Sequence, residues 1–230
     1  MNIRNTDPEF VGIFDRFAHD EVVNEPGAGL DAPVRYLAIL ASLIGCGGVD
    51  AFREVLPDAV KNGVTPVMVR ECVYQSTDYL GYGRMLPFLK VMNEYFESTG
   101  MTLPLAPQST TNTENRLEKG IDAQAEIFGE HMREAWKKGH INRWLAENCF
   151  GDYYTRTGLD TRQREMITFC FLAALGGCEP QLTSHAGANL RIGNDNAFLI
   201  QVISQCLPYI GYPRSLNALR CVNDAAQAAR

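Results

Sequence analysis

The clearest hydrophobic pattern lies in residues 166–175, MITFCFLAAL, where apolar side chains surround nearly the whole circumference of a helix. A helix that is apolar on all sides is buried in a protein core. Asp160 precedes this stretch as an N-cap, and Gln163, three residues later, completes a capping-box pattern. The paired glycines Gly176 and Gly177 follow it. The pattern therefore predicts a buried helix between Asp160 and these glycines.

Proline, glycine and capping residues predict three more helices downstream. Pro180 suits the first turn of the next helix, and Gly193 suits its left-handed C-terminal cap. Asn194 or Asp195 can cap a third helix, and a fourth follows Pro213. Because no alternating strand of useful length is present, the sequence predicts an all-α fold.

The chain also repeats itself. QSTDYLGYGRML (75–86) aligns with QCLPYIGYPRSL (205–216). The identical positions are Gln75/Gln205, Tyr79/Tyr209, Gly81/Gly211, Tyr82/Tyr212, Arg84/Arg214 and Leu86/Leu216. Upstream, with a single one-residue gap, Leu30-Asp31, Arg35 and Gly63 align with Leu159-Asp160, Arg164 and Gly193. This self-similarity predicts a tandem duplication, residues 30–98 and 159–228, with the two helical units related by a pseudo-two-fold.

The stretch between the two copies has a different character. ESTGMTLPLAPQSTTNTEN is rich in Pro, Ser, Thr and Asn and has no periodicity, which is typical of a connector. A helical pattern of mixed charged and apolar residues follows it at 116–136. We therefore divide the chain into an N-terminal degenerate domain (1–98), a linker (99–115) and a C-terminal domain (116–230) that carries the candidate site.

Composition and charge narrow the function classes. Apolar residues make up 46% of the chain and charged residues 21%, as in ordinary globular proteins. A net charge of −6 argues against nucleic acid or an anionic membrane as the main partner. No apolar run reaches the roughly 18 residues of a membrane span, and the first residues lack a signal-peptide pattern. Seven cysteines without a CxxC fit reduced thiols, so a cytoplasmic location is expected.

Candidate chemistry is concentrated in the segment GGCEPQLTSHAG, residues 176–187. In a helix that starts near Cys178, the side chains of Cys178, Gln181 and His185 fall on one face. Glu165 lies at the start of the preceding buried helix, where an unpaired carboxylate is costly. If the two helices pack together, this carboxylate can fix the tautomer of the imidazole and favour its charged form, which suits acid/base catalysis.

Structural explanations compete with this interpretation. A buried cysteine often acts as a small hydrophobe, a helix histidine as a hydrogen-bonded core residue, and Glu165 as a partner of its own helix amides. The first copy has Gly48 and Val55 where the second has Cys178 and His185, so the fold does not require these two residues. Glu, Cys and His are also zinc ligands, but no compact ligand spacing supports a metal site. The remaining histidines, at positions 19, 131 and 140, lie among charged residues.

The second half of the chain contains three distinctive segments: YTRTGLDTRQRE, the AALGG…QLTSHAGANLRIG run and Y-x-G-x-P. With these segments it resembles a 4-carboxymuconolactone decarboxylase-type domain. The first half is similar to a degenerate second copy. The same superfamily contains AhpD-like alkylhydroperoxidases, whose Glu, first Cys and His match Glu165, Cys178 and His185. Gln181 stands where their second Cys would be, which removes the dithiol that peroxidase turnover requires.

The resemblance implies tandem AhpD-like helical domains and a homo-oligomer, a trimer of two-domain chains that mimics a six-domain ring. It also implies a cofactor-free decarboxylase (a carboxy-lyase) acting on a small lactone or cyclic carboxylic acid. His185 would donate the proton, oriented by Glu165 and next to Cys178. The expected substrate-binding residues are Arg162, Arg164, Arg191, Gln181 and Tyr209. Two alternatives stay open: an alkylhydroperoxidase-like thiol antioxidant that uses Cys178, and a non-catalytic helical oligomer or binding protein.

Overall fold

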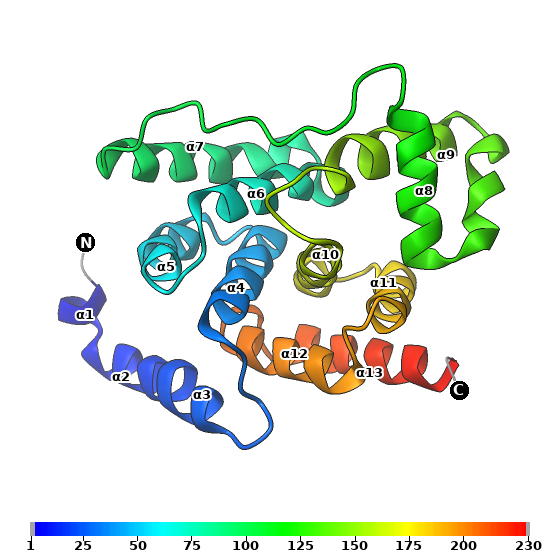
Figure 1. Ribbon diagram of the computed structural model, residues 1–230. Coiled ribbons are helices and arrows are strands. Elements are labelled where there is room, and N and C mark those ends of the chain that lie inside the picture. Colours follow the sequence, from blue (N-terminus) through cyan, green and yellow to red (C-terminus); the bar gives the residue numbers. More distant parts are fainter. Residues whose placement is uncertain (1–2, 229–230) are drawn as a thin grey trace.

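The computed structural model describes residues 3–228, and all of the regular structure in this range is helical. The predicted all-α fold is confirmed. Two groups of four helices follow one another (Figure 1), and their lengths are 15, 13, 15 and 17 residues in both groups. The first group is α4 (Ala32–Cys46), α5 (Val49–Lys61), α6 (Pro66–Leu80) and α7 (Tyr82–Ser98); the second is α10 (Thr161–Leu175), α11 (Glu179–Arg191), α12 (Asn196–Ile210) and α13 (Tyr212–Ala228).

Each group is preceded by further helices that include a π-helical segment. Before the first group lie α1 (Ile3–Thr6), α2 (Pro8–Arg16), the π-helical η1 (Phe17–Glu21) and α3 (Val22–Asn24); before the second lie α8 (Arg116–Phe128), the 3₁₀-helical η2 (Glu130–Lys138), α9 (His140–Trp144) and the π-helical η3 (Leu145–Tyr154). The helix expected over 116–136 therefore ends earlier, at Phe128. Gly129 has a φ of +111°, a conformation that favours glycine, and it turns the chain there.

The predicted caps explain where the central helices begin. Asp160 accepts from the Gln163 amide at 2.8 Å, and the Gln163 side chain accepts from the Asp160 amide at 3.0 Å, which is a capping box. Asp195 caps α12 by accepting from the Phe198 amide at 2.8 Å. Asn194, the other candidate for that cap, instead bonds through its side chain to Arg162 and Asn189.

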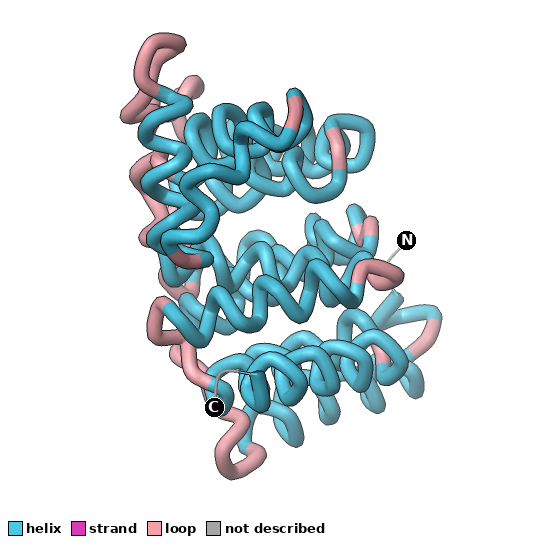
Figure 2. Tube along the Cα trace, turned by 90° about the vertical axis from the view of Figure 1, so that its right-hand side faces the viewer, coloured by secondary structure: helices cyan, strands magenta, loops and turns pink. Residues whose placement is uncertain are grey.

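The helices lie in stacked layers, visible from the side in Figure 2. In Figure 1, α4, α5, α10 and α11 form a middle layer between α6 and α7 on one side and α12 and α13 on the other. At the centre, α4 packs directly against α10. A Cβ on Gly45 would lie only 2.7 Å from the Phe171 carbonyl oxygen, so the two backbones approach too closely for any larger residue.

This contact helps to bury the apolar helix α10. From Arg164 to Ala174 every residue of α10 is buried within the single chain. A partner subunit is not needed for that burial, and the trimer implied by the resemblance stays a prediction. In the described part of the chain, no helix has both the length and the hydropathy to cross a membrane.

Two crossed hydrogen bonds connect the halves. Arg164 of α10 donates to the Gln75 side chain of α6 at 2.8 Å, and Arg35 of α4 donates to the Gln205 side chain of α12 at 2.7 Å. The sequence alignment pairs these same residues, Arg35 with Arg164 and Gln75 with Gln205. A pseudo-two-fold generates such a reciprocal pair, which supports the predicted duplication of the chain.

Candidate functional site

The site is centred on a carboxylate–imidazole pair between α10 and α11. His185 Nδ1 lies 2.8 Å from Glu165 Oε2. Glu165 is fully buried, and the side chain of His185 is 11% exposed. Because Nδ1 is engaged by the carboxylate, Nε2 is the ring nitrogen left for another partner. The geometry required of an oriented acid/base histidine is therefore present.

The Glu165 carboxylate is held from its other side by a tyrosine. The Tyr154 hydroxyl of η3 donates to Glu165 Oε1 at 2.6 Å and lies 2.8 Å from the Tyr79 hydroxyl of α6. Burial raises the pKa of both phenols well above their usual range, so both remain protonated near neutral pH. Asn189 bonds to the backbone carbonyls of both Glu165 and His185, at 3.1 and 2.8 Å. These contacts fix the pair in place.

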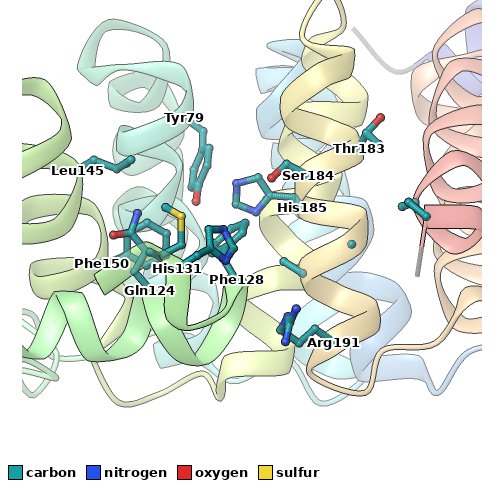
Figure 3. Close-up of a pocket in the computed structure, with 15 residues that line it drawn as sticks. Tyr79, Gln124, Phe128, His131, Leu145, Phe150, Thr183, Ser184, His185 and Arg191 are labelled. Carbon is teal, nitrogen blue, oxygen red and sulfur yellow. The ribbon is translucent and has the colours of Figure 1, made fainter. Parts of the chain in front are cut away.

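The His185 ring forms part of the wall of a pocket of about 530 Å³ (Figure 3). Aromatic rings meet it edge to face: the Tyr79 centroid is 5.5 Å from the His185 centroid, and the Phe128 centroid is 5.1 Å away. Phe150, Leu145 and Met132 complete the apolar wall. A pocket of this size and character is typical of small-molecule sites.

The polar rim of the pocket favours an anionic ligand. Arg191, at the end of α11, and His131, in η2, both line it, and within residues 3–228 no carboxylate does. Gly129 brings these two side chains near one another, since a Cβ placed there would be 3.5 Å from the Arg191 guanidinium carbon and 3.2 Å from His131 Nδ1. An arginine guanidinium binds carboxylates through paired hydrogen bonds.

Cys178 does not lie in the pocket with His185. It is the N-cap of α11 with φ −135° and ψ 37°, and its thiol donates to the Leu172 carbonyl at 3.4 Å. The expected shared helix face required both residues to be helical, and Cys178 is not. Burial, aided by Glu179, raises the pKa of its thiol. Gln181 is exposed on α11 and also lies outside the pocket.

Of the predicted substrate-binding residues, Arg191 alone lines this pocket. Arg164 is buried and donates to Gln75 and Glu71, and Arg162 donates to the Gly193 carbonyl and to Asn194 in the loop after α11. Tyr209 lies in a different hollow, where its ring meets Phe14 at 5.7 Å. Arg162 and Arg164 thus bond to groups of the protein itself, and Tyr209 faces another hollow, so none of the three lies at the His185 pocket.

Sequence analysis missed the part of the wall that comes from other segments. Tyr79 belongs to the first half of the chain, while Gln124 and Phe128 belong to α8. Tyr79 could have been recognised as a candidate, because it is one of the repeated positions. The prediction instead assigned the binding role to its counterpart, Tyr209. Nothing in the sequence around Gln124 marks it.

Comparison with known proteins shows that part of this chain is similar to a known family. Residues 140–224 match the carboxymuconolactone decarboxylase family. The matched region contains Glu165, His185 and Arg191, whereas α6 and α8 precede it. The chain is also similar to a 4-carboxymuconolactone decarboxylase of Acinetobacter baylyi, at 26% identity over 119 residues that cover 49% of this chain and 88% of that protein. The matched region thus contains the Glu165–His185 pair, and the preceding helices supply much of the wall.

A metal centre is not supported. Among residues 3–228 no group of three or more His, Cys, Asp or Glu side chains is arranged to hold a metal ion. Glu165 and His185 bond to each other, and Cys178 is directed elsewhere.

Proposed function

We propose that the chain is a cofactor-free decarboxylase of a small lactone or cyclic carboxylic acid, with His185 as the proton donor. The observation that carries this proposal is the buried Glu165–His185 pair, 2.8 Å apart, at the wall of an apolar pocket that Arg191 also lines. The carboxymuconolactone decarboxylase match over the same residues supports the reaction class.

The reaction needs little from the protein beyond binding and one proton. The bond from the ring carbon to the carboxylate breaks, CO₂ leaves, and the electron pair passes through the conjugated ring to the lactone oxygen. Nε2–H of protonated His185 then donates its proton to carbon, and the imidazole regains a proton from water. Each turnover consumes one proton, and Glu165 stabilises the charged imidazole between turnovers.

Arg191 and His131 bind the substrate carboxylate at the rim in this proposal. The flat ring of the substrate lies among Tyr79, Phe128 and Phe150, whose apolar surroundings strengthen electrostatic effects on the reacting atoms. The thiol chemistry of the alternative function has less support, because no cysteine within the described range lines the pocket. The two-domain division, the trimer and the cytoplasmic location belong to the proposal as predictions.

The test is CO₂ release from 4-carboxymuconolactone and from related lactone acids, with the product formed in D₂O and analysed by mass spectrometry. We expect CO₂ release and one carbon-bound deuteron in each product molecule. Glu165→Gln should slow the reaction because the neutral amide no longer stabilises charged His185. A protein that folds but releases CO₂ from none of these acids would rule the proposal out.

A further inference from the structure

A chain of buried hydrogen bonds leads from Arg164 to the side chain of Glu165. Arg164 Nη1 donates to Gln75 Oε1 at 2.8 Å, and Gln75 Nε2 donates to Thr168 Oγ1 at 2.9 Å. Thr168 Oγ1 lies 2.8 Å from the Tyr154 hydroxyl, which donates to Glu165 Oε1 at 2.6 Å. None of these residues is more than 7% exposed. Because Gln75 belongs to α6, the chain of bonds connects the first half of the molecule to the site.

The guanidinium of Arg164 fixes the direction of every bond in this chain. A guanidinium can only donate, so Gln75 presents its oxygen to Arg164 and its NH₂ group to Thr168. Gln75 Nε2 also donates to the Arg164 carbonyl at 3.0 Å, which requires the same orientation. Since Thr168 Oγ1 accepts from Gln75, its own hydrogen is available for Tyr154. The Tyr154 hydrogen goes to Glu165, because an ionised carboxylate can only accept.

The corresponding bonds in the other half of the molecule lead to the backbone. Arg35 donates to Gln205, but the Gln205 NH₂ group donates to two backbone carbonyls, at 3.1 and 2.7 Å. The residue aligned with Thr168 is Ile39, which has no hydroxyl group. The arginine–glutamine bond between the halves thus forms without such an extension, and the extension through Thr168 and Tyr154 accompanies the acid/base pair.

The Tyr154 hydroxyl has its largest effect when His185 has lost its proton. In the protonated pair, the imidazolium partly neutralises the Glu165 carboxylate. In the deprotonated pair, the carboxylate charge is buried beside a neutral ring. A hydrogen bond to a charged group favours the charged form, so the hydroxyl stabilises the deprotonated pair more than the protonated pair. The pair therefore releases its proton more readily than it would without this hydroxyl.

Other titratable or charged groups lie around the pair or its pocket: Tyr79 and Asp78 on α6, Cys149 on η3, His131 on η2, Arg164 on α10 and Arg191 on α11. Burial raises the pKa of both Tyr79 and Cys149 well above the usual range, so both stay neutral near neutral pH. Burial also raises the pKa of Asp78 to about 7. Among the described residues, Tyr154 and His185 are the two that hydrogen-bond to the Glu165 carboxylate.

We propose that Tyr154, oriented by the chain from Arg164, is a positioning residue that makes the Glu165–His185 pair a stronger acid. Gln75 and Thr168 act through Tyr154, so the first half of the molecule contributes to the acid/base pair of the second half. This proposal deepens the proposed function and rests on it for the reaction, in which a stronger acid delivers its proton to the substrate carbon more readily.

An NMR titration of the His185 ring protons in the substrate-free chain tests the proposal, and the resonances that disappear in His185→Ala identify this ring. Tyr154→Phe should raise the midpoint of the His185 titration by about one pH unit, as for the loss of one hydrogen bond to a charged group. Thr168→Val should raise it by less, because Tyr154 keeps its hydroxyl and loses only a donor to it. Asp78 is present in all of these variants, so its titration does not contribute to the differences between them.

Two matched variants serve as controls. Tyr153→Phe removes the hydroxyl of the adjacent tyrosine, which does not bond to Glu165, and Thr168→Ser keeps the hydroxyl of the chain. Both should retain the wild-type midpoint. Thermal melts establish that each variant is folded, and Thr168→Val compared with Thr168→Ser carries the test if Tyr154→Phe unfolds.

The pH profile of CO₂ release gives a second readout. Its alkaline limb should move to higher pH in Tyr154→Phe by the same amount as the NMR midpoint, whereas a purely structural role would lower the rate without moving the limb. An unchanged or lowered midpoint in Tyr154→Phe, or an equal rise in Tyr153→Phe, would overturn the proposal. The NMR titration requires no turnover, so a chain that shows the expected midpoints but releases no CO₂ would contradict the decarboxylase proposal alone.

Discussion

Two hollows occupy corresponding places in the two halves of the molecule, and only one contains an oriented acid/base pair. The first is the His185 pocket. The second, of about 670 Å³, is lined by Tyr36, Val55 and Tyr209. In the alignment of the halves Val55 stands at the position of His185, and Tyr36 stands at that of Glu165. The backbone and the hollow tolerate either set, so the fold does not require the Glu165–His185 pair.

The second hollow has a histidine of its own, but in a different setting. His19, from η1, lies 3.9 Å from Asp15, and both side chains are substantially exposed. Burial and the nearby Arg35 lower the pKa of His19, which disfavours its charged form. In the first pocket the carboxylate is fully buried and 2.8 Å from the ring. The two histidines thus differ in their carboxylate partners. The carboxylate beside His185 is buried and bonded to the ring, whereas the one beside His19 is partly exposed and farther away.

The largest expected effect is on stability, and it concerns the buried ion cluster formed by Glu71, Arg156 and Arg164. Glu71 is fully buried and accepts from Arg156 at 2.7 Å and from Arg164 at 3.1 Å. Its aligned counterpart, Gln201, is half-buried. Glu71→Leu leaves a buried arginine without its counter-charge, so the free energy of unfolding should fall by about 3–5 kcal/mol. Gln201→Leu should change it by less than about 1 kcal/mol.

Urea denaturation of the two variants measures this difference. Equal losses for Glu71→Leu and Gln201→Leu would mean that the two halves are held by equivalent forces and that the cluster has no special role.

The next effect is on turnover. His185→Ala removes the proposed proton donor and should lower the rate of CO₂ release by at least about 100-fold, the lower end for loss of a general acid. Val55→Ala, at the aligned position in the second hollow, should leave the rate within about twofold. Circular dichroism of both variants checks that they are folded. If the rate fell equally in both variants, the activity would not depend on the His185 pocket more than on the second hollow.

The features of this site that could be predicted from the sequence are those that depend on residues close together in the chain. Caps and glycine stops are local, so the boundaries of α10 and α12 could be predicted from Asp160 and Asp195. The Glu165–His185 contact could be predicted as well, because the cost of a buried carboxylate requires a partner and consecutive helices usually pack together.

The wall of the pocket could not be predicted, because it depends on packing between distant segments. Tyr79 and Gln124 reach the pocket from α6 and α8, and no local pattern carries that information. Arg164 illustrates the same limit. In the sequence it is one charge among several, but its partner Glu71 belongs to the other half of the chain and makes it a buried structural residue.

The smallest effect is expected at Cys178, which the sequence alignment pairs with Gly48. Its thiol donates to the Leu172 carbonyl and does not reach the pocket, so Cys178→Ala should leave CO₂ release within about twofold of the wild-type rate. The raised pKa keeps the thiol protonated at neutral pH and makes it a poor nucleophile toward peroxide. We therefore expect little peroxide consumption with a dithiol reductant, measured alongside CO₂ release in both proteins. If the wild-type chain consumed peroxide and Cys178→Ala abolished this, the active residue would be the thiol outside the pocket, and the contrast between the two hollows would not explain the activity.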